Sequence, residues 1–512
     1  MKDLSGVMQG PRKLTGSLLA LIGLTLVAVA AGVASSVGGP LSGGMASLAV
    51  VFAAAAIIVY GLERSRPGYL AVEMPVLLIL FATLTLRYSF AGGPQSAAEL
   101  TENPFDIFSL FQLGCTALAA ALGLLALTAP KPLGERVTSR PVRFYALYTG
   151  IILLGLVASV NPLLTAYRAL EVLACLLVAA GAYRARGTEA LMRIEAMVFW
   201  YFVAMAASAW LGAIIFPGIG LERINSPIPF RLVGVLPRIS SNSVGTFGCL
   251  IALWSLARLL AKDREWGPPR AVSVFLVIFG LVTLVMAQYR TGYAMLAAGV
   301  ALLLLLAGRR ALASLAVVGL LGIGLLGGGI FEEAQPYVLR GQDTERASRL
   351  SGRVTYWTAA LPVWRESPIF GAGLETASRL LVLNDLDTEK GSASNLHSTW
   401  VEALVGTGLV GVTALALSFL IAWGRSLRRA FDGASRIVPA ILLTVLLLRT
   451  LTGGTIQGGG DLLLLFLTLA LGLRDHYGAR DQGPPGLRSP TGAPVEPHDH
   501  LAKADSRSPR HS

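Results

Sequence analysis

Charged residues are scarce in this chain of 512 residues. They make up 14% of it, against 54% hydrophobic residues, whereas a soluble domain averages about 25% charged residues. The mean hydropathy is +0.65. This balance excludes a soluble protein and predicts an integral membrane protein. The net charge of +12 does not indicate a nucleic-acid partner, since most of it lies in short loops between apolar runs and in the C-terminal tail, where it sets topology.

Cysteines and the common catalytic motifs are also few or absent. Cys115, Cys175 and Cys249 lie in or beside apolar runs without the spacing of a metal site, as small buried hydrophobic residues do. The sequence has no P-loop, no HExxH and no CxxC. The run GTGLVG at 406–411 matches GxGxxG, but it lies within a span and follows no strand, so we interpret it as helix packing. We expect no metal and no cofactor, and any reaction must draw its energy from an activated substrate.

Long apolar runs dominate what is present. A run of about 20 residues crosses the hydrocarbon layer as a helix. We therefore predict an all-α polytopic integral membrane protein with about 14 transmembrane helices (12–14), the last two being short. The runs are 16–36, 45–62, 69–90, 107–128, 144–160, 164–183, 194–216, 243–261, 271–287, 291–307, 311–330, 399–423, 438–451 and 461–473.

Four parts of the chain follow from these runs. Residues 1–15 form a cytoplasmic N-terminus, and the first apolar run is expected to stay as a helix rather than to be removed as a signal peptide. Residues 16–473 form the transmembrane bundle, with a large helical periplasmic loop inserted at 331–398. Residues 474–512 are rich in proline, glycine, serine and charge, so we predict a disordered cytoplasmic tail.

Lysine and arginine set the orientation of the spans. With the N-terminus inside, every inner loop is basic, whereas the outer loops before residue 221 carry no lysine or arginine. Basic loops face the cytoplasm, so both termini are predicted to be cytoplasmic. Later outer segments break the rule, namely 217–242 with Arg223, Arg231 and Arg238, the hairpin with Arg290, and the loop 331–398 with Arg340, Arg346, Arg349, Arg353, Arg365, Arg379 and Lys390.

Arginine that opposes the topology signal needs a separate reason. Binding of an outward-facing anion is one, because guanidinium groups bind phosphate oxygens in bidentate fashion. The alternative is that long outer loops tolerate charge freely.

Charged residues also occur within the predicted spans. Arg168 and Glu171 are three residues apart and can pair on one helix face. Glu402 and Arg449 lie in later spans, and such residues usually face a bundle interior or a cavity. Snorkelling to the interface is the alternative for Arg449 and for Arg87.

The loop 331–398 carries the features that indicate chemistry. Residues 344–364 fit one amphipathic helix that lies on the membrane surface and holds arginines at phosphate depth; mere contact with lipid headgroups is the alternative. Pro362 can kink or end this helix. His397 stands at the mouth of the next span, where Ser398 or Thr399 can cap the helix. A histidine there can act as a general base near neutral pH, or it can be an interfacial capping residue.

Four motifs follow one another between about residue 230 and residue 411. They are RLVGVLPRISSNSVG, the YRTG hairpin, GRVTYWTAALPVWRESPIFGAG and LHSTWVEALVGTGLVG. This order, with all four motifs on the predicted outer face, resembles the O-antigen ligase and polymerase superfamily of bacterial envelopes. Tyr289 stands where that family usually has serine, and Ser398 stands where it usually has asparagine.

The resemblance implies a helical multi-span fold, similar to lipid-dependent glycosyltransferases, and metal-independent glycosyl transfer at the periplasmic face of the bacterial inner membrane. The donor would be a glycan on undecaprenyl diphosphate, and the acceptor lipid A-core in a ligase or another lipid-linked glycan in a polymerase. Carried over by motif, Arg231 and Arg290 would hold the diphosphate with help from Arg353, and Arg238 is an alternative to Arg231. His397 would position or deprotonate the acceptor hydroxyl, with Arg349, Glu402 and Ser398 in support.

The sequence leaves several alternatives open. The number of spans and the long outer loop favour a polymerase over a ligase without separating them. A lipid-glycan flippase or another multi-span transporter is the rival class, which would have discontinuous helices at mid-bilayer and similar halves. A non-catalytic scaffold in an envelope complex is a third possibility. Membrane lipids are expected partners in every case, and nucleic acid in none.

Overall fold

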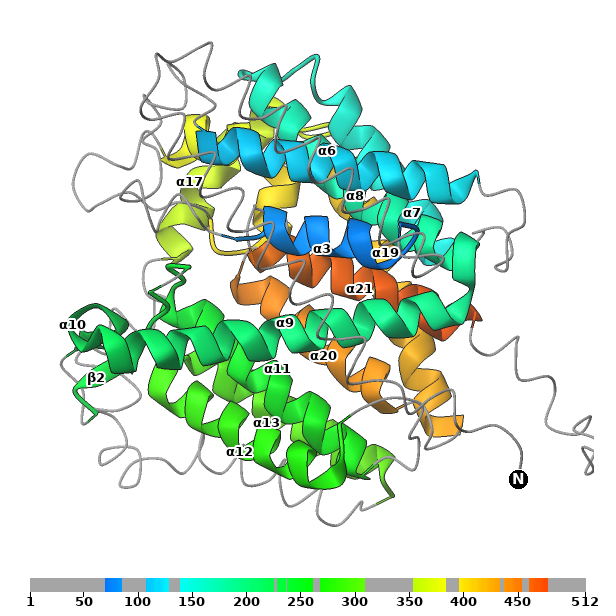
Figure 1. Ribbon diagram of the computed structural model, residues 1–512. Coiled ribbons are helices and arrows are strands. Elements are labelled where there is room, and N and C mark those ends of the chain that lie inside the picture. The colour runs from blue at the N-terminus through cyan, green and yellow to red at the C-terminus, as the bar shows by residue number, and fades with distance from the viewer. Residues whose placement is uncertain are drawn as a thin grey trace, which may run out of the picture.

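The described part of the chain is helical throughout, apart from one short hairpin (Figure 1). The computed structural model describes residues 70–84, 107–128, 139–224, 228–235, 237–260, 268–308, 353–383, 396–432, 437–453 and 460–477. The first group of helices is α3 (Glu73–Ala82), α6 (Ile107–Leu127), α7 (Arg140–Leu154), α8 (Pro162–Arg186), α9 (Thr188–Ile215) and α10 (Pro217–Gly220). Strands β1 (Leu221–Arg223) and β2 (Phe230–Leu232) then form an antiparallel hairpin in which Glu222 faces Arg231.

The second group surrounds the region in which the four motifs occur. It consists of α11 (Ser241–Leu260), α12 (Arg270–Ala287), α13 (Arg290–Leu306), α17 (Arg353–Glu366), the π-helix η3 (Ala377–Leu383), α19 (Thr399–Asp432), α20 (Ile437–Thr452) and α21 (Gly460–Tyr477). Consecutive antiparallel helices place alternate loops at the same end of the bundle. The hairpin after α9 and the turn between α12 and α13 therefore share one end, and Figure 1 shows α17 and β2 toward the same side.

Six helices of the described part are long and apolar enough to cross a membrane: α6, α8, α9, α11, α12 and α19. Three shorter helices, α3, α13 and α20, are also apolar. The structure thus confirms an all-α membrane protein but does not confirm about 14 spans. The predicted spans 16–36, 45–62 and 311–330 lie outside the described residues.

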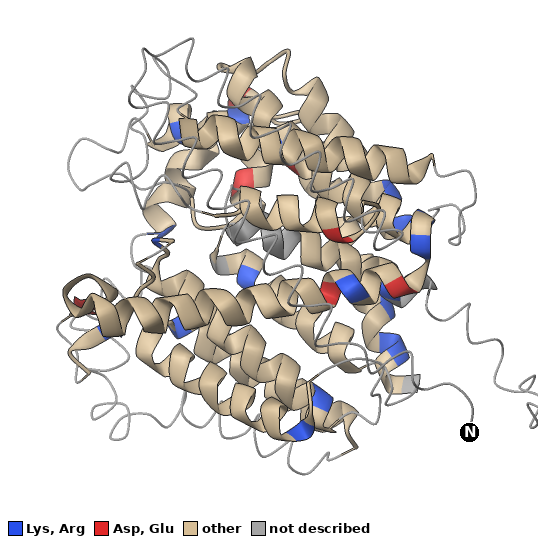
Figure 2. Cartoon of the chain, in the orientation of Figure 1, with Lys and Arg blue, Asp and Glu red and all other residues tan. Residues whose placement is uncertain are grey.

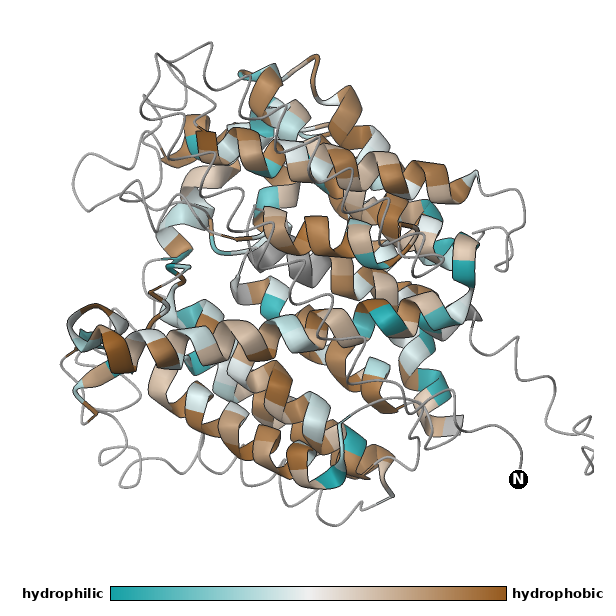
Figure 3. Cartoon of the chain, viewed as in Figure 1, coloured by the Kyte–Doolittle hydropathy of each residue, from teal (hydrophilic) through white to brown (hydrophobic). Residues whose placement is uncertain are grey.

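The outer surface of the bundle is apolar, as contact with lipid requires. On α12, Phe275 and Ile278 are exposed, and similar exposed side chains line α6 and α7. Figure 3 shows hydrophobic colours along these helices, and Figure 2 shows charged positions mainly toward the two ends of the bundle. In water such surfaces would drive aggregation, so the bilayer is the solvent that this surface fits.

Small residues let the helices approach closely. An added Cβ on Gly280 of α12 would lie 2.6 Å from the carbonyl oxygen of Gly248 in α11. Gly123 of α6 and Gly181 of α8 form a second such contact, where a Cβ would collide with the opposite backbone. Without a hydrophobic driving force between helices in lipid, this close packing is a main source of stability.

Helix ends follow the local sequence, and several of them differ from the expected spans, as at α9, which begins at Thr188 rather than at 194. The helix expected over 144–160 is Arg140–Leu154, because Pro141 can open a helix at its first turn and residues 155–160 are needed to reverse the chain into α8. The span expected over 399–423 continues as helix to Asp432, because the basic loop that follows contains no proline to stop it.

Candidate active site

His397 lies on a tightly held turn at the start of α19. The preceding residue, Leu396, is held through both of its backbone polar groups. Its N–H donates to Oε1 of Glu402 (2.6 Å), and its carbonyl accepts from Nε1 of Trp357 (2.9 Å). His397 itself has φ of +54°, a conformation that costs a residue with a side chain about 1 kcal/mol or more. The surrounding contacts therefore impose the direction in which the imidazole leaves the backbone.

The end of α20 holds the start of α19. The N–H and the hydroxyl of Thr399 both donate to the carbonyl of Gly453, at 3.2 and 3.0 Å. The Thr399 hydroxyl thus ties two helices together, a role that the expected capping did not include. The guanidinium of Arg449 occupies the space where a side chain at position 453 would begin, because a Cβ on Gly453 would fall on Nη1 of Arg449. Arg449 is 7% exposed, and it is brought to the helix start that carries His397.

Two arginines act on the imidazole. Burial, together with the positive charges of Arg353 and Arg449, lowers the pKa of His397 from 6.5 to about 4. Burial also lowers the pKa of Arg353, to which Tyr289 contributes an opposing effect and Arg449 a further lowering. The ring of Tyr356 lies 6.4 Å from that of His397. The site therefore combines a neutral imidazole with two nearby guanidinium groups.

Arg290 begins α13 directly after a pinned turn. The side-chain amide of Gln288 donates to the carbonyls of Ile228 (2.9 Å) and Phe230 (3.0 Å), which fixes this turn against the hairpin. Tyr289 is buried, and its Cβ lies so close to Gly245 that a side chain at position 245 would collide with it. Since Tyr289 also influences Arg353, the turn that carries Arg290 reaches the region of His397.

Arg231 is engaged within the hairpin. Its Nε and Nη2 donate to the two carboxylate oxygens of Glu222, both at 2.8 Å. Arg238 is exposed in a loop closed by reciprocal backbone hydrogen bonds between Gly234 and Ile239. The structure thus places Arg353 and Arg449 where their charges act on His397, whereas it pairs Arg231 with Glu222.

Helix α17 supplies Arg353 from its first turn and packs against the chain around His397. Its buried side is formed by Ala360 with Tyr356, Ala359, Val363 and Trp364, against Ala377, Val382, Leu396 and Val405. Val354 and Leu361 of the same helix are 39% and 41% exposed, so they do not belong to this buried side. Pro362 neither ends nor interrupts the helix. Arg346 and Arg349 lie outside the described residues.

Helix α19 is broken at Gly408, within the GTGLVG run that we interpreted as helix packing. Gly408 has φ of +63°, and a Cβ there would collide with the backbone of Ile369. The turn at 367–373 fills the break. Leu409 and Val410 donate their N–H groups to Pro368 and Ile369, while Ala372 and Gly373 donate to Val405 and Gly406. Backbone groups freed by a broken helix must find partners in a membrane, and here the preceding loop provides them.

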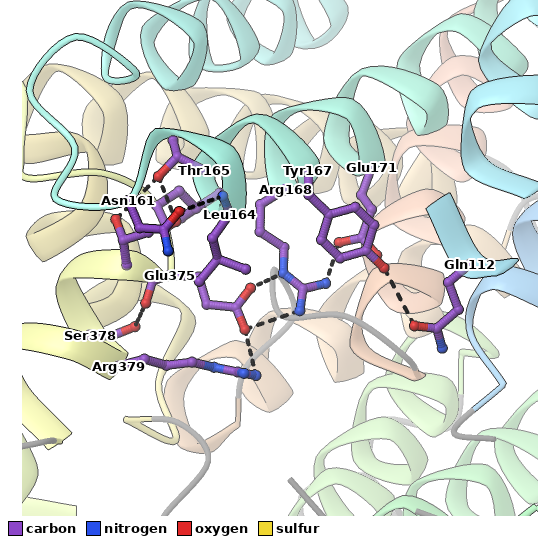
Figure 4. A network of polar contacts seen from close by, with 12 residues as sticks. Gln112, Asn161, Leu164, Thr165, Tyr167, Arg168, Glu171, Glu375, Ser378 and Arg379 are labelled. Atoms are coloured by element: carbon purple, nitrogen blue, oxygen red, sulfur yellow. Dashed lines mark hydrogen bonds and ion pairs between the residues drawn. The ribbon is translucent and has the colours of Figure 1, made fainter. Parts of the chain in front are cut away.

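A buried ionic cluster fixes the segment between this turn and His397 (Figure 4). Nη1 of Arg168 lies 2.5 Å from Oε2 of Glu171, which confirms the predicted pair. Arg168 also binds Glu375, and Arg379 binds Oε1 of Glu375 at 2.5 Å. Glu375 and Arg379 were not predicted as partners, because they lie more than 200 positions away in a polar loop. The cluster ties η3 and its approach to α8.

Among the described residues, no group of three or more histidine, cysteine, aspartate or glutamate side chains is placed to hold a metal ion. The comparison with curated proteins gave no match. Residues 275–416 match the family model described as O-antigen ligase. This segment contains Arg290, Arg353 and His397, while Arg231, Arg238 and Arg449 lie outside it. Within 275–416 the chain is thus similar to the O-antigen ligase family, and this match bears out the predicted resemblance to the O-antigen ligase and polymerase superfamily.

Proposed function

We propose that the protein transfers a glycan from undecaprenyl diphosphate to an acceptor glycan at the periplasmic face of the bacterial inner membrane. The acceptor is lipid A-core if the protein is a ligase, or another lipid-linked glycan if it is a polymerase. The observation that carries this proposal is the neutral imidazole of His397 beside the guanidinium groups of Arg353 and Arg449. The outer location is supported by the arginines that oppose the topology signal on that side, with both termini in the cytoplasm.

The proposed step is a displacement at the anomeric carbon of the donor. The acceptor hydroxyl oxygen forms the new bond to this carbon, and its proton passes to a nitrogen of His397. The bond from the anomeric carbon to the diphosphate oxygen breaks, and the lipid diphosphate leaves with the electron pair. Arg290 and Arg353 stabilise the charge that develops on it, as preorganised donors do in a site that excludes water.

Binding of the donor also prepares the base. An imidazole with a pKa of about 4 is a weak base in the free protein. A diphosphate placed among the arginines offsets their charge, and a nearby negative charge raises the pKa of a histidine. The site thus has a neutral base before the donor arrives and a stronger one after it has bound.

Incubation of purified protein with a lipid diphosphate-linked oligosaccharide tests this function. Longer lipid-linked chains are the expected product of a polymerase, and transfer to added lipid A-core that of a ligase. Separation of the products by gel or mass spectrometry distinguishes them. If neither product forms with protein that remains folded, glycan transfer is excluded for these substrates.

The pH dependence of transfer gives a second prediction. We expect kcat/KM for the donor to stay level from pH 8 down to about pH 5 and to fall below that, because His397 becomes protonated only near its lowered pKa of about 4. An unperturbed histidine would give half of the maximal value near pH 6.5. Arg353 and Arg449 act on its charge, the ring of Tyr356 lies 6.4 Å away, and Glu402 accepts from the N–H of the preceding residue, Leu396. Steady-state rates in a constant-ionic-strength buffer measure the profile, and a midpoint near 6.5 would contradict the proposed environment.

The pair of Arg231 and Glu222 gives a third prediction. If Arg231 binds the diphosphate, Glu222 competes for it, and Glu222→Gln should lower KM for the donor severalfold. Because a partly exposed pair contributes at most about 1 kcal/mol to stability, thermal unfolding should hardly change. Steady-state kinetics of Glu222→Gln and Arg231→Gln measure this, with Arg238→Gln to test the alternative arginine. An unchanged KM in Glu222→Gln and Arg231→Gln assigns Arg231 to the hairpin alone.

One observation favours the rival class of transporter. Transport sites are often built from discontinuous helices, and α19 is discontinuous at Gly408. The break lies in the helix that begins two residues after His397, so this feature fits both transport and glycan transfer. Uptake of a lipid-linked glycan into vesicles without any change in chain length would support transport over transfer.

A further inference from the structure

Arg449 is a buried charged residue within an otherwise apolar stretch of α20. It lies near the C-terminal end of α20 in the run ILLTVLLLRTL and is 7% exposed. Its guanidinium passes over Gly453, where any side chain would collide with it. The carbonyl of the same glycine accepts both hydrogen bonds from Thr399, two residues after His397. Arg449 is therefore directed toward the start of α19 rather than toward lipid.

Like charges are brought together at this point. Arg449 and Arg353 come from helices that are almost a hundred positions apart, and each acts on His397. Arg449 also disfavours the charged form of Arg353. Placing two guanidinium groups near each other in a half-buried site costs free energy, because their repulsion is weakly screened there. Such an arrangement is expected where the protein binds an anion with more than one negative charge.

We infer that Arg449 is a binding residue for the diphosphate of the donor and that it holds this group together with Arg353. The inference rests on the proposed function and adds a residue that lies outside the segment matched by the O-antigen ligase family. Guanidinium groups bind two oxygens of a phosphate at once, so two of them suit two linked phosphates. Helix α20 thereby contributes to the site directly, and Gly453 contributes by leaving room for the side chain of Arg449.

A purely structural role is the competing explanation. Arg449 lies beside the contact between α19 and α20, so it could hold these helices together without touching substrate. In that case its loss would lower stability and would weaken all ligands alike. A role in binding instead predicts a specific loss of affinity for the diphosphate, larger than the loss for a monophosphate with the same lipid.

The experiment compares Arg449→Gln with the wild type in nanodiscs. The probes are farnesyl diphosphate and farnesyl monophosphate, and the readouts are Kd and the thermal unfolding midpoint. Arg365→Gln is the matched control, because Arg365 is an exposed arginine at the other end of α17. We expect Arg449→Gln to weaken diphosphate binding at least about tenfold and monophosphate binding distinctly less, with Tm close to that of the wild type and Arg365→Gln unchanged.

Two results would overturn the inference. One is diphosphate affinity equal to that of the wild type, and the other is an equal loss for both probes together with a lower Tm. If Arg449→Gln does not fold, Arg449→Lys is measured instead. Lysine keeps the charge but cannot bind in bidentate fashion, so a several-fold loss for the diphosphate supports the inference and an unchanged affinity overturns it. Because these readouts are equilibrium binding, they stay separate from a failure to observe glycan transfer.

Discussion

Replacing His397 by alanine is expected to lower the rate of glycan transfer at least about a hundredfold, which is the usual contribution of a general base. The imidazole is the group placed to take the proton of the acceptor hydroxyl in the proposed site. Loss of long-chain surface glycan in cells, together with product analysis on purified protein, measures the effect. The amount of protein in the membrane should stay near that of the wild type.

Backbone strain has to be separated from the loss of the imidazole. Since His397 has φ of +54°, the variant His397→Asn is the better partner to alanine, because asparagine tolerates this conformation. It should be folded and equally inactive. His498→Ala in the C-terminal tail is the matched control and should transfer glycan normally. Transfer at a wild-type rate in His397→Asn would remove the imidazole from the mechanism.

Replacing Arg168 by leucine is expected to destabilise the protein by about 3–5 kcal/mol, the cost of removing one partner from a buried ionic group. Arg168 is 8% exposed, and Glu171 and Glu375 are each 1% exposed. Without the arginine, two carboxylates remain inside the bundle, and Arg379 still pairs with Glu375. Cys115, Cys175 and Cys249 are all buried, so a dye that reacts with newly exposed thiols can report the thermal unfolding of purified protein.

Arg193→Leu is the matched control for this experiment. Arg193 binds Glu73 and Glu189, but its side chain is 40% exposed, and pairs in water contribute at most about 1 kcal/mol. We expect Tm to fall clearly in Arg168→Leu and only slightly in Arg193→Leu. Equal shifts in the two variants would mean that the buried cluster does not stabilise the fold.

Helix positions could be predicted well because hydrophobic length is a physical requirement of the bilayer. The runs at 107–128 and 271–287 match α6 and α12 to within a residue at each end. Two runs that seemed short, 438–451 and 461–473, are also helices, α20 and α21. Where boundaries differed, as at α7 and at the end of α19, the cause was local: a proline that opens a helix, or the lack of a residue that stops one.

The site was less predictable because its contacts join distant parts of the chain. His397 and Arg353 were predicted as site residues from motif order and charge. Arg449 was noticed as a charge in an apolar run, but its direction depends on Gly453 and on the docking of α20 against α19. Glu375 carried no local signal at all, and the break at Gly408 could not be predicted because the turn that fills it lies about 40 positions earlier.

The interruption of α19 has a consequence for how the protein is made. Residues 399–431 are apolar over a length that the insertion machinery can accept as one continuous segment. The finished structure instead needs a gap at Gly408, occupied by residues 367–373. Those residues precede α19 in the sequence, so they are synthesised before it. Assembly of this part of the molecule therefore requires that the turn at 367–373 docks into the break of α19 once that helix has formed.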